Sequence, residues 1–155
     1  MRDKRFIAEH RGGSLKKEQH IQLMKWACEC AENVLPLLGE EPDERLKSAL
    51  LIAKEWVTEK ATVGDARKAS LGAIAVANES SNPIEIAVAR AVGHAVATAH
   101  MADHSLGAAL YALKALKNAG KSIDAERIWQ KEQLPSEIME LVLTAMIGKE
   151  KGLKI

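Results

Sequence analysis

The chain has 155 residues, of which 47% are hydrophobic and 28% charged, and its formal net charge is +1. These values favour one folded domain over residues 1–155 and argue against a disordered chain or a dedicated nucleic-acid binder, which usually carries a clear basic excess. No apolar run approaches the roughly 18 to 20 residues of a membrane span, and no hydrophobic leader follows Met1, so we expect a cytoplasmic protein without a membrane partner.

Residues 1–17 are polar and carry six Lys or Arg residues against two acidic ones, with a break at Gly12-Gly13. A nucleic-acid arm is one interpretation of this segment. A solvated or loosely docked N-terminal segment is the interpretation that we favour. Residues 149–155 are also polar, and we expect this tail to fray.

The composition predicts an all-α fold. Aromatic residues make up only 3% of the chain and alanine is abundant. Alanine is the best helix former, whereas strands favour β-branched and aromatic side chains. Apolar residues recur at helical spacing in seven segments. These segments are 17–38, 43–60, 64–79, 83–101, 103–119, 123–132 and a seventh that opens at residue 134.

The segment 83–101 has the clearest helix start, because Asn82 can cap a helix and Pro83 suits its first position. Its Ala, Val and Gly residues cover most of the circumference, which indicates a central helix surrounded by others. No period of about 34 residues recurs along the chain. We therefore predict an irregular bundle of about seven helices with an alanine-rich central helix, in preference to a solenoid-like stack.

A candidate polar pocket is formed by His94, His100, Asp103, His104 and Tyr111. His100 and His104 are four residues apart, a spacing that can place two imidazoles on one face to bind a metal, and Asp103 could orient one of them. On a continuous helix His94 would lie about 15 Å from His104. It could join the others only if the helix breaks near residues 101–102.

A metal site at His100, Asp103 and His104 stays an alternative interpretation. A zinc or di-iron site needs a third or fourth protein ligand, and no Glu-x-x-His pair includes His94, His100 or His104. We favour packed core histidines, with Asp103 as the N-cap of the next helix. We expect no cofactor and no catalytic residue, since neither a Gly-rich phosphate loop nor a Gly-x-Ser-x-Gly elbow occurs.

The two cysteines, Cys28 and Cys30, are two residues apart in a helical segment and so point in different directions. They cannot form a disulfide with each other there, and a lone Cys-x-Cys is a poor zinc signature. We interpret both as reduced thiols that pack as small hydrophobic side chains.

Two features suit a partner surface. Trp129 lies in a polar string of residues and could anchor a partner. The acidic turn, which contains Glu40, Glu41, Asp43 and Glu44, could meet a basic partner, although a solvated charged turn is the interpretation that we favour. A homodimer formed through Trp129 or an alanine-rich face is a further alternative.

Several strings resemble the family of bacterial immunity proteins numbered five, which belong to polymorphic toxin systems. The strings are Arg11-Gly12-Gly13-Ser14-Leu15, residues 26–35, Trp56, the stretch 64–67, residues 93–100, residues 104–115, Trp129-Gln130 and Leu134-Pro135. The resemblance covers nearly the whole chain. It implies an all-α, non-enzymatic protein that neutralises a cognate toxin by protein–protein binding; the alternative is a metal-binding protein or metalloenzyme that uses the His/Asp cluster.

Overall fold

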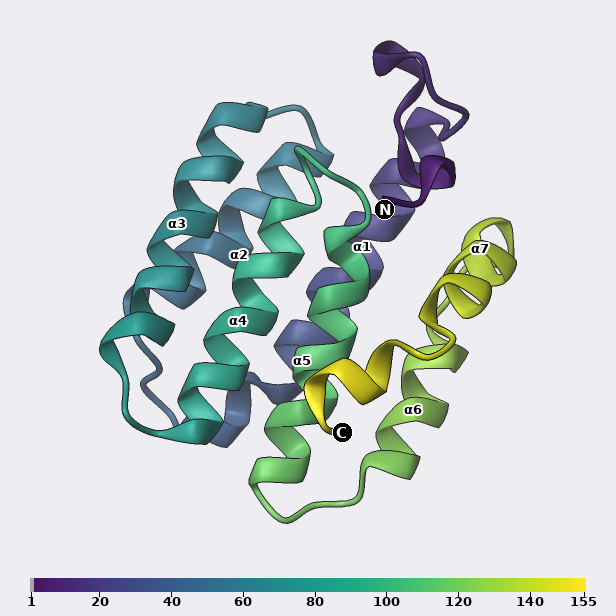
Figure 1. Cartoon of the computed structure of the whole chain (residues 1–155). Coiled ribbons are helices and arrows are strands. Elements are labelled where there is room, and N and C mark those ends of the chain that lie inside the picture. The colour runs from purple at the N-terminus through teal and green to yellow at the C-terminus, as the bar shows by residue number, and fades with distance from the viewer. Residues whose placement is uncertain (1) are drawn as a thin grey trace.

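The computed structural model describes residues 2–155 and consists of seven α-helices and four short 3-10 helices (Figure 1). The all-α prediction is confirmed, and this part of the chain contains no β-strand apart from an isolated bridge between Ala8 and Leu15. The α-helices are α1 (Lys17–Val34), α2 (Glu44–Val57), α3 (Val63–Glu79), α4 (Pro83–Ala97), α5 (His104–Asn118), α6 (Ile123–Glu132) and α7 (Ser136–Met146). The 3-10 helices are η1 (Lys4–Phe6), η2 (Glu9–Arg11), η3 (Leu35–Leu38) and η4 (Lys149–Leu153).

Helix α4 lies at the centre of the bundle, as predicted. It contacts α1, α2, α3 and α5, and Figure 1 shows it between α3 and α5. Its buried residues occur on all sides of the helix, because small Ala, Val and Gly side chains leave room for neighbours in every direction. The buried set is Ala87, Val88, Ala89, Ala91, Val92, Gly93, Ala95, Val96 and Ala97.

Helices α3 and α4 approach each other closely at Gly93. The Ser70 hydroxyl on α3 donates to the Gly93 carbonyl oxygen at 3.0 Å. A Cβ atom at Gly93 would lie 3.1 Å from Cγ1 of Ile74, tighter than ordinary packing. The absence of a side chain at this position therefore sets the spacing of the two helices.

Helix α6 is held against α1 and α5 by buried polar contacts. Trp26 Nε1 on α1 donates to the Gln130 carbonyl oxygen at 2.9 Å, and Gln130 Nε2 donates to the Ala109 carbonyl oxygen at 3.0 Å. Asn33 donates to both carboxylate oxygens of Glu126 at 2.8 Å. Trp26, Gln130 and Glu126 are buried and would be costly to bury without their partners, whereas Asn33 is exposed. Together these contacts fix the position of α6.

Three predicted helices end three or four residues early, and the one predicted over 43–60 ends at Val57. The first predicted helix, 17–38, divides into α1 and the 3-10 helix η3, because Pro36 lacks the backbone N–H that an α-helix requires at this point. The helix predicted over 83–101 ends at Ala97. None of the helices in residues 2–155 is both long enough and apolar enough to cross a bilayer.

The N-terminal segment packs against the bundle and is not simply solvated. Phe6 and Leu15 are only 1% and 2% exposed, and they belong to the core that contains Trp26. Arg5 also donates to the Thr144 hydroxyl on α7 at 2.7 Å. The composition of this segment is dominated by basic residues, and it therefore gave no indication that Phe6 and Leu15 are buried.

The C-terminal tail is likewise ordered over part of its length. Glu150, in η4, forms an ion pair with Arg127 on α6. Lys117 Nζ on α5 donates to the Lys154 carbonyl oxygen at 2.7 Å. These contacts join the tail to two helices, where the polar sequence had suggested fraying.

The cap at the start of α4 gives the first prediction. Asn82 Oδ1 accepts from the backbone N–H groups of Ile84 and Glu85 at 2.8 and 3.3 Å. We expect Asn82→Ala to lower the free energy of unfolding by about 1 kcal/mol, because these two N–H groups lose their acceptor. Chemical unfolding followed by circular dichroism measures this. Ser81→Ala, at the exposed neighbouring position, is the control and should change stability by less than about 0.5 kcal/mol; equal losses would contradict the role of the cap.

Candidate functional site

The chain reverses direction between α4 and α5. Carbonyl groups at the end of a helix have no partner within it and need donors from elsewhere. His20 Nε2 lies 2.6 Å from the Thr98 carbonyl oxygen, and Arg11 Nη1 donates to the His100 carbonyl oxygen at 3.3 Å. The predicted helix over 83–101 is therefore wrong at its C-terminal end, because side chains from the N-terminal part of the chain bind these carbonyls in a turn.

His20 is buried on α1, with an exposed fraction of 7%, and its ring lies 4.9 Å from that of Trp56. A carbonyl oxygen only accepts, so Nε2 of His20 carries the hydrogen and donates to Thr98. Burial lowers the pKa of His20, although the hydrogen bond to Thr98 opposes this shift. The ring is therefore a neutral structural donor at pH 7.

The reversal brings His94 and His104 together. Their Nδ1 atoms lie 3.1 Å apart, within hydrogen-bonding distance. The separation of about 15 Å expected for a continuous helix does not apply, since α4 ends at Ala97 and α5 begins at His104 on its way back. The break that would let His94 join the candidate pocket is thus present, slightly earlier in the chain than residues 101–102.

Four of the five predicted pocket residues form a row of rings in contact, which we call the histidine row: His100, His104, His94 and Tyr111. Ring centroids are 5.3 Å apart for His100 and His104 and 5.1 Å apart for His94 and His104. Tyr111 stacks on His94 at 5.2 Å with an interplanar angle of 20°. The guanidinium of Arg90 lies 5.8 Å from the Tyr111 centroid, in cation–π range. All four rings are partly buried.

The surroundings of the histidine row favour neutral rings. Burial lowers the pKa of His94 to about 4, and His104 and Arg90 add to the effect. Burial also lowers the pKa of His104, against the influence of Asp103, and that of His100. At pH 7 one Nδ1–H of the His94–His104 pair therefore donates to the other ring's Nδ1 lone pair.

Asp103 precedes α5 but does not cap it through its side chain, which corrects the prediction of a carboxylate cap. Its backbone is helical, with φ −70° and ψ −12°, whereas a capping residue usually adopts extended angles. The carboxylate instead pairs with Arg2 Nη1 at 3.3 Å. Within residues 2–155 no hydrogen bond joins Asp103 to a histidine, so it does not orient an imidazole as a metal site would require.

The part of the chain that the structure describes contains no group of three or more His, Cys, Asp or Glu side chains arranged to hold a metal ion. The candidate ligands Asp103 and His104 instead bind Arg2 and His94. Both cysteines are free and buried in the core. Burial raises the pKa of Cys28 to about 12, and raises that of Cys30, so the thiols are protonated at neutral pH and unsuited to metal binding or nucleophilic attack.

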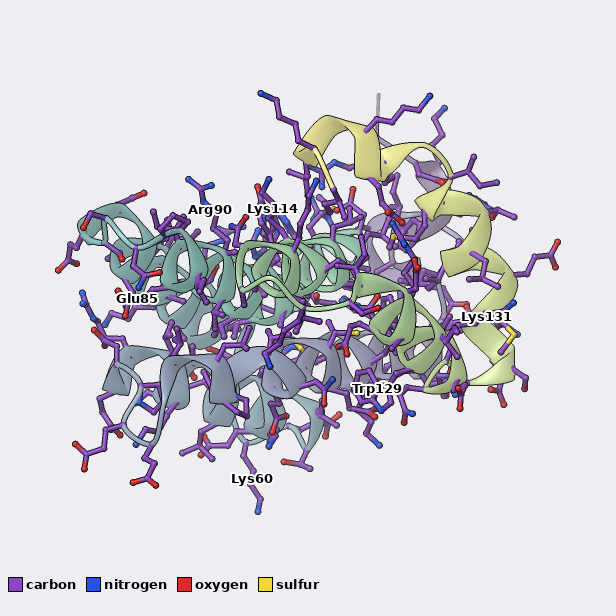
Figure 2. All side chains as sticks on the ribbon, turned by 90° about the horizontal axis from the view of Figure 1, so that it is seen from below. Lys60, Glu85, Arg90, Lys114, Trp129 and Lys131 are labelled. Atoms are coloured by element: carbon purple, nitrogen blue, oxygen red, sulfur yellow. The ribbon has the colours of Figure 1, made fainter. Side chains whose placement is uncertain are left out.

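The features predicted for a partner surface lie apart. Glu41 and Asp43 line a cavity together with Glu85. Figure 2 shows Glu85 and Trp129 in opposite halves of the molecule. Trp129 is on α6 and is partly exposed. The predicted set therefore forms two separate surfaces.

The members of the acidic turn differ in their contacts. Asp43 accepts from the backbone and the guanidinium of Arg45, and so caps α2. Glu44 lies 3.6 Å from Lys47. The side chains of Glu40 and Glu41 are exposed and form no hydrogen bond or ion pair within residues 2–155.

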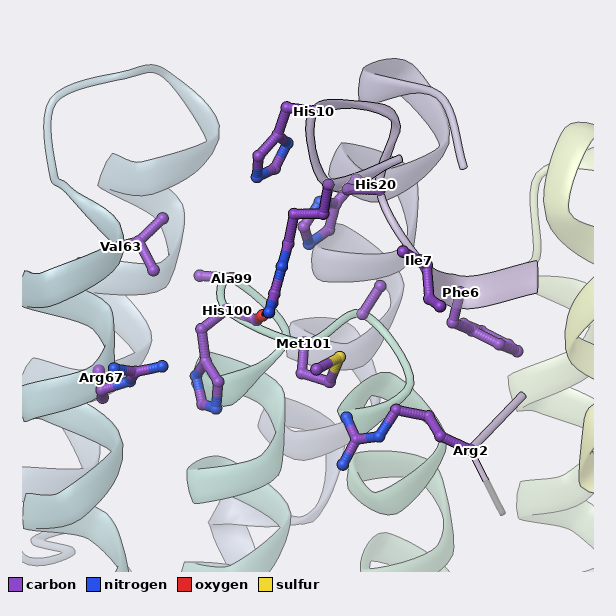
Figure 3. Close-up of a pocket in the computed structure, with 13 residues that line it drawn as sticks. Arg2, Phe6, Ile7, His10, His20, Val63, Arg67, Ala99, His100 and Met101 are labelled. Atoms are coloured by element: carbon purple, nitrogen blue, oxygen red, sulfur yellow. The ribbon is translucent and has the colours of Figure 1, made fainter. Parts of the chain in front are cut away.

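A cavity that the sequence did not predict lies between the N-terminal segment, the start of α3 and the turn after α4 (Figure 3). Its volume is about 410 Å³. Its basic lining residues are Arg2, His10, Arg11, His20, Arg67 and His100, of which only His100 was a predicted site residue. The burial of His20 could have been predicted from the sequence, because it falls on the apolar face of α1 with Met24 and Ala27. The arginines carry no local sequence signal.

Comparison with known proteins gives one family. A model described as "Imm-5 like putative immunity protein" matches residues 13–137, well over half of the chain. The resemblance drawn from the sequence is thereby confirmed. No curated protein and no solved structure matches the chain significantly.

The position of His94 depends on Gly107. A Cβ atom at Gly107 would lie 2.6 Å from His94 Nδ1 and 2.7 Å from its Cγ. We expect Gly107→Ala to lower the free energy of unfolding by about 1 to 3 kcal/mol, because His94 is held on its other sides and must shift. Gly72→Ala is the matched control in a helix: nothing lies within 4 Å of its added methyl, so stability should rise by about 0.5 to 1 kcal/mol. Effects of the same sign in thermal or chemical unfolding would contradict this packing.

Stability should fall in mild acid. The unfolded chain binds a proton at His94 below about pH 6.5, whereas the folded chain resists it until about pH 4. The stabilisation is therefore complete above pH 6.5 and is lost as the pH falls toward 4, by up to about 3 kcal/mol. Urea unfolding between pH 7.5 and 4.5 tests this. We expect a shallower decline in His94→Gln and an unchanged one in His10→Gln, since His10 is exposed; identical slopes in the wild type and His94→Gln would refute the assignment.

Proposed function

Because the chain belongs to the Imm-5 like immunity-protein family, we propose that it is an immunity protein that neutralises a cognate toxin in the cytoplasm by binding it, without catalysing a reaction. The match of the family model to residues 13–137 carries this proposal. A rigid helical bundle suits such a role, because a preorganised surface loses little freedom on binding.

We place the main partner contact on α6. Ile128 is 60% exposed, and the next residue, Trp129, is partly exposed. The helix itself is fixed by a buried hydrogen bond from Trp26 and a partly buried one from Asn33, both on α1. Figure 2 shows Trp129 on this helix. Tryptophan on a rigid element is a frequent energetic centre of protein interfaces, since it buries a large area at little entropic cost.

The acidic turn offers a second contact if the toxin is basic. Glu40 and Glu41 are exposed and their charges face no cation within residues 2–155, so they are available to a partner. Charges at the rim of an interface mainly raise the rate of association. Asp43 is less suited to this role, because it already caps α2.

A metal-binding function has less support from the geometry. Of its three candidate ligands, Asp103 pairs with Arg2 and His104 pairs with His94. We expect protein purified without chelator or affinity tag to contain well under one equivalent of zinc, iron or manganese. Elemental analysis measures this, and a stoichiometric metal that is lost on His104→Ala would favour the metalloprotein instead.

The binding proposal is tested by producing this chain together with candidate toxin domains in a bacterial host whose growth those domains arrest. We expect growth to be rescued, and the purified pair to bind with a Kd in the nanomolar range or below. The double variant Ile128→Ala/Trp129→Ala should weaken binding by about 2 kcal/mol or more, roughly 30-fold. Leu71→Ala is the control, because Leu71 is 64% exposed on α3, far in sequence from α6.

Two results would count against the proposal. Neither rescue nor binding would contradict neutralisation by this chain. If the double variant rescues growth and binds the toxin as well as the wild type does, the chain is an immunity protein but its interface does not lie on α6.

A further inference from the structure

The cavity beside the turn after α4 has the charge and shape of an anion site. Its 410 Å³ fall within the range of about 300 to 1,000 Å³ that is usual for small-molecule pockets. Figure 3 shows Arg67 reaching from α3 toward the His100 ring, with Arg2 on the opposite side. Its lining residues, all within the described part of the chain, include three arginines and three histidines but no acidic residue.

Two of the three arginines are not neutralised. Arg2 is paired with Asp103 at 3.3 Å. Arg11 donates to the His100 carbonyl, which leaves its charge uncompensated by a carboxylate. Arg67 is exposed and forms no ion pair within residues 2–155. Unpaired guanidinium groups that converge on one cavity suit a ligand with at least two negative charges, and their fork of donors matches phosphate oxygens.

One nitrogen of His100, which lines the cavity, has no hydrogen-bond partner within residues 2–155. His100 Nδ1 is buried and has no hydrogen-bond partner in the part of the chain described by the structure. Buried polar atoms are usually paired, so an unpaired one near two arginines that lack a carboxylate partner in this described part points to a missing ligand. Burial, His104 and the three arginines together lower the pKa of His100, and an anion bound there would reverse the arginine effect.

The rest of the lining is apolar. Ile7, Val63 and Met101 contribute carbon surface next to the charged groups, and Val63 is 42% exposed. A site that combines such a wall with guanidinium groups suits a molecule with an anionic head and an organic body.

We propose that this cavity binds a phosphate group, with Arg11, Arg67 and His100 as its recognition residues. The group arrives either as free phosphate or as the phosphate ester of a small organic molecule. The site is separate from the surface on α6, so this proposal does not depend on the toxin-binding role.

The test is isothermal titration calorimetry of the full chain at 50 mM salt with five probes: inorganic phosphate, pyrophosphate, adenosine monophosphate, adenosine and a Glu-rich peptide. We expect the three phosphate compounds to bind and adenosine not to bind. Arg67→Gln should weaken phosphate binding tenfold or more. Lys68→Gln is the matched control, because it removes the same charge one residue away, outside the lining of the cavity, and should change the affinity less than twofold.

Both variants are at exposed helix positions and should remain folded, which their thermal unfolding checks. Nuclear magnetic resonance of the His100 ring gives a second measurement: saturating phosphate should raise the pKa of His100 in the wild type and less so in Arg67→Gln. Tighter binding of adenosine monophosphate than of phosphate would support an ester ligand, and equal binding would support free phosphate.

Three results would overturn the proposal. They are no binding of any phosphate probe up to 10 mM, equal weakening by Arg67→Gln and Lys68→Gln, and tighter binding of a Glu-rich peptide than of every phosphate compound. The second result would mean that only diffuse charge attracts the anion. The third would make the cavity a docking site for an acidic protein segment.

Discussion

The buried hydrogen bond from His20 to the Thr98 carbonyl joins the start of α1 to the end of α4, and the remaining features near the turn depend on it. It supplies a donor to a carbonyl that a helix terminus leaves without one. The chain can then reverse and place α5 beside α4, which brings His94 to His104. The same turn forms one wall of the cationic cavity through Ala99 and His100.

The sequence predicted those parts of the fold that depend on local signals. The start of α4 was evident because Asn82 and Pro83 adjoin the helix that they begin. Its central place followed from the spread of Ala and Val around its circumference. The end of the same helix was not evident, since the donor that binds the Thr98 carbonyl lies 78 positions earlier in the chain.

The sequence predicted which residues belong to the candidate site, but not which residues they contact. His94, His100, His104 and Tyr111 were identified from their chemistry and spacing, and they do meet. Their partners were not identified, because Arg2 reaches Asp103 across 101 positions of sequence and Arg11 reaches His100 across 89. Contacts of this range are created by tertiary packing, and no periodicity within a helix encodes them. The cationic cavity could not be predicted for the same reason, because its lining residues come from segments far apart in the sequence.

The alanine-rich packing of α3, α4 and α5 has an entropic consequence. Ala and Gly have no side-chain rotamers to lose on burial, so this part of the core becomes ordered at little side-chain entropy while burying only a modest apolar area per residue. An added methyl group meets neighbouring atoms at once, as the surroundings of Gly93 and Gly107 illustrate. Substitutions that add volume are therefore tolerated best on the outer faces of the bundle, where a side chain can change without moving the helix axes.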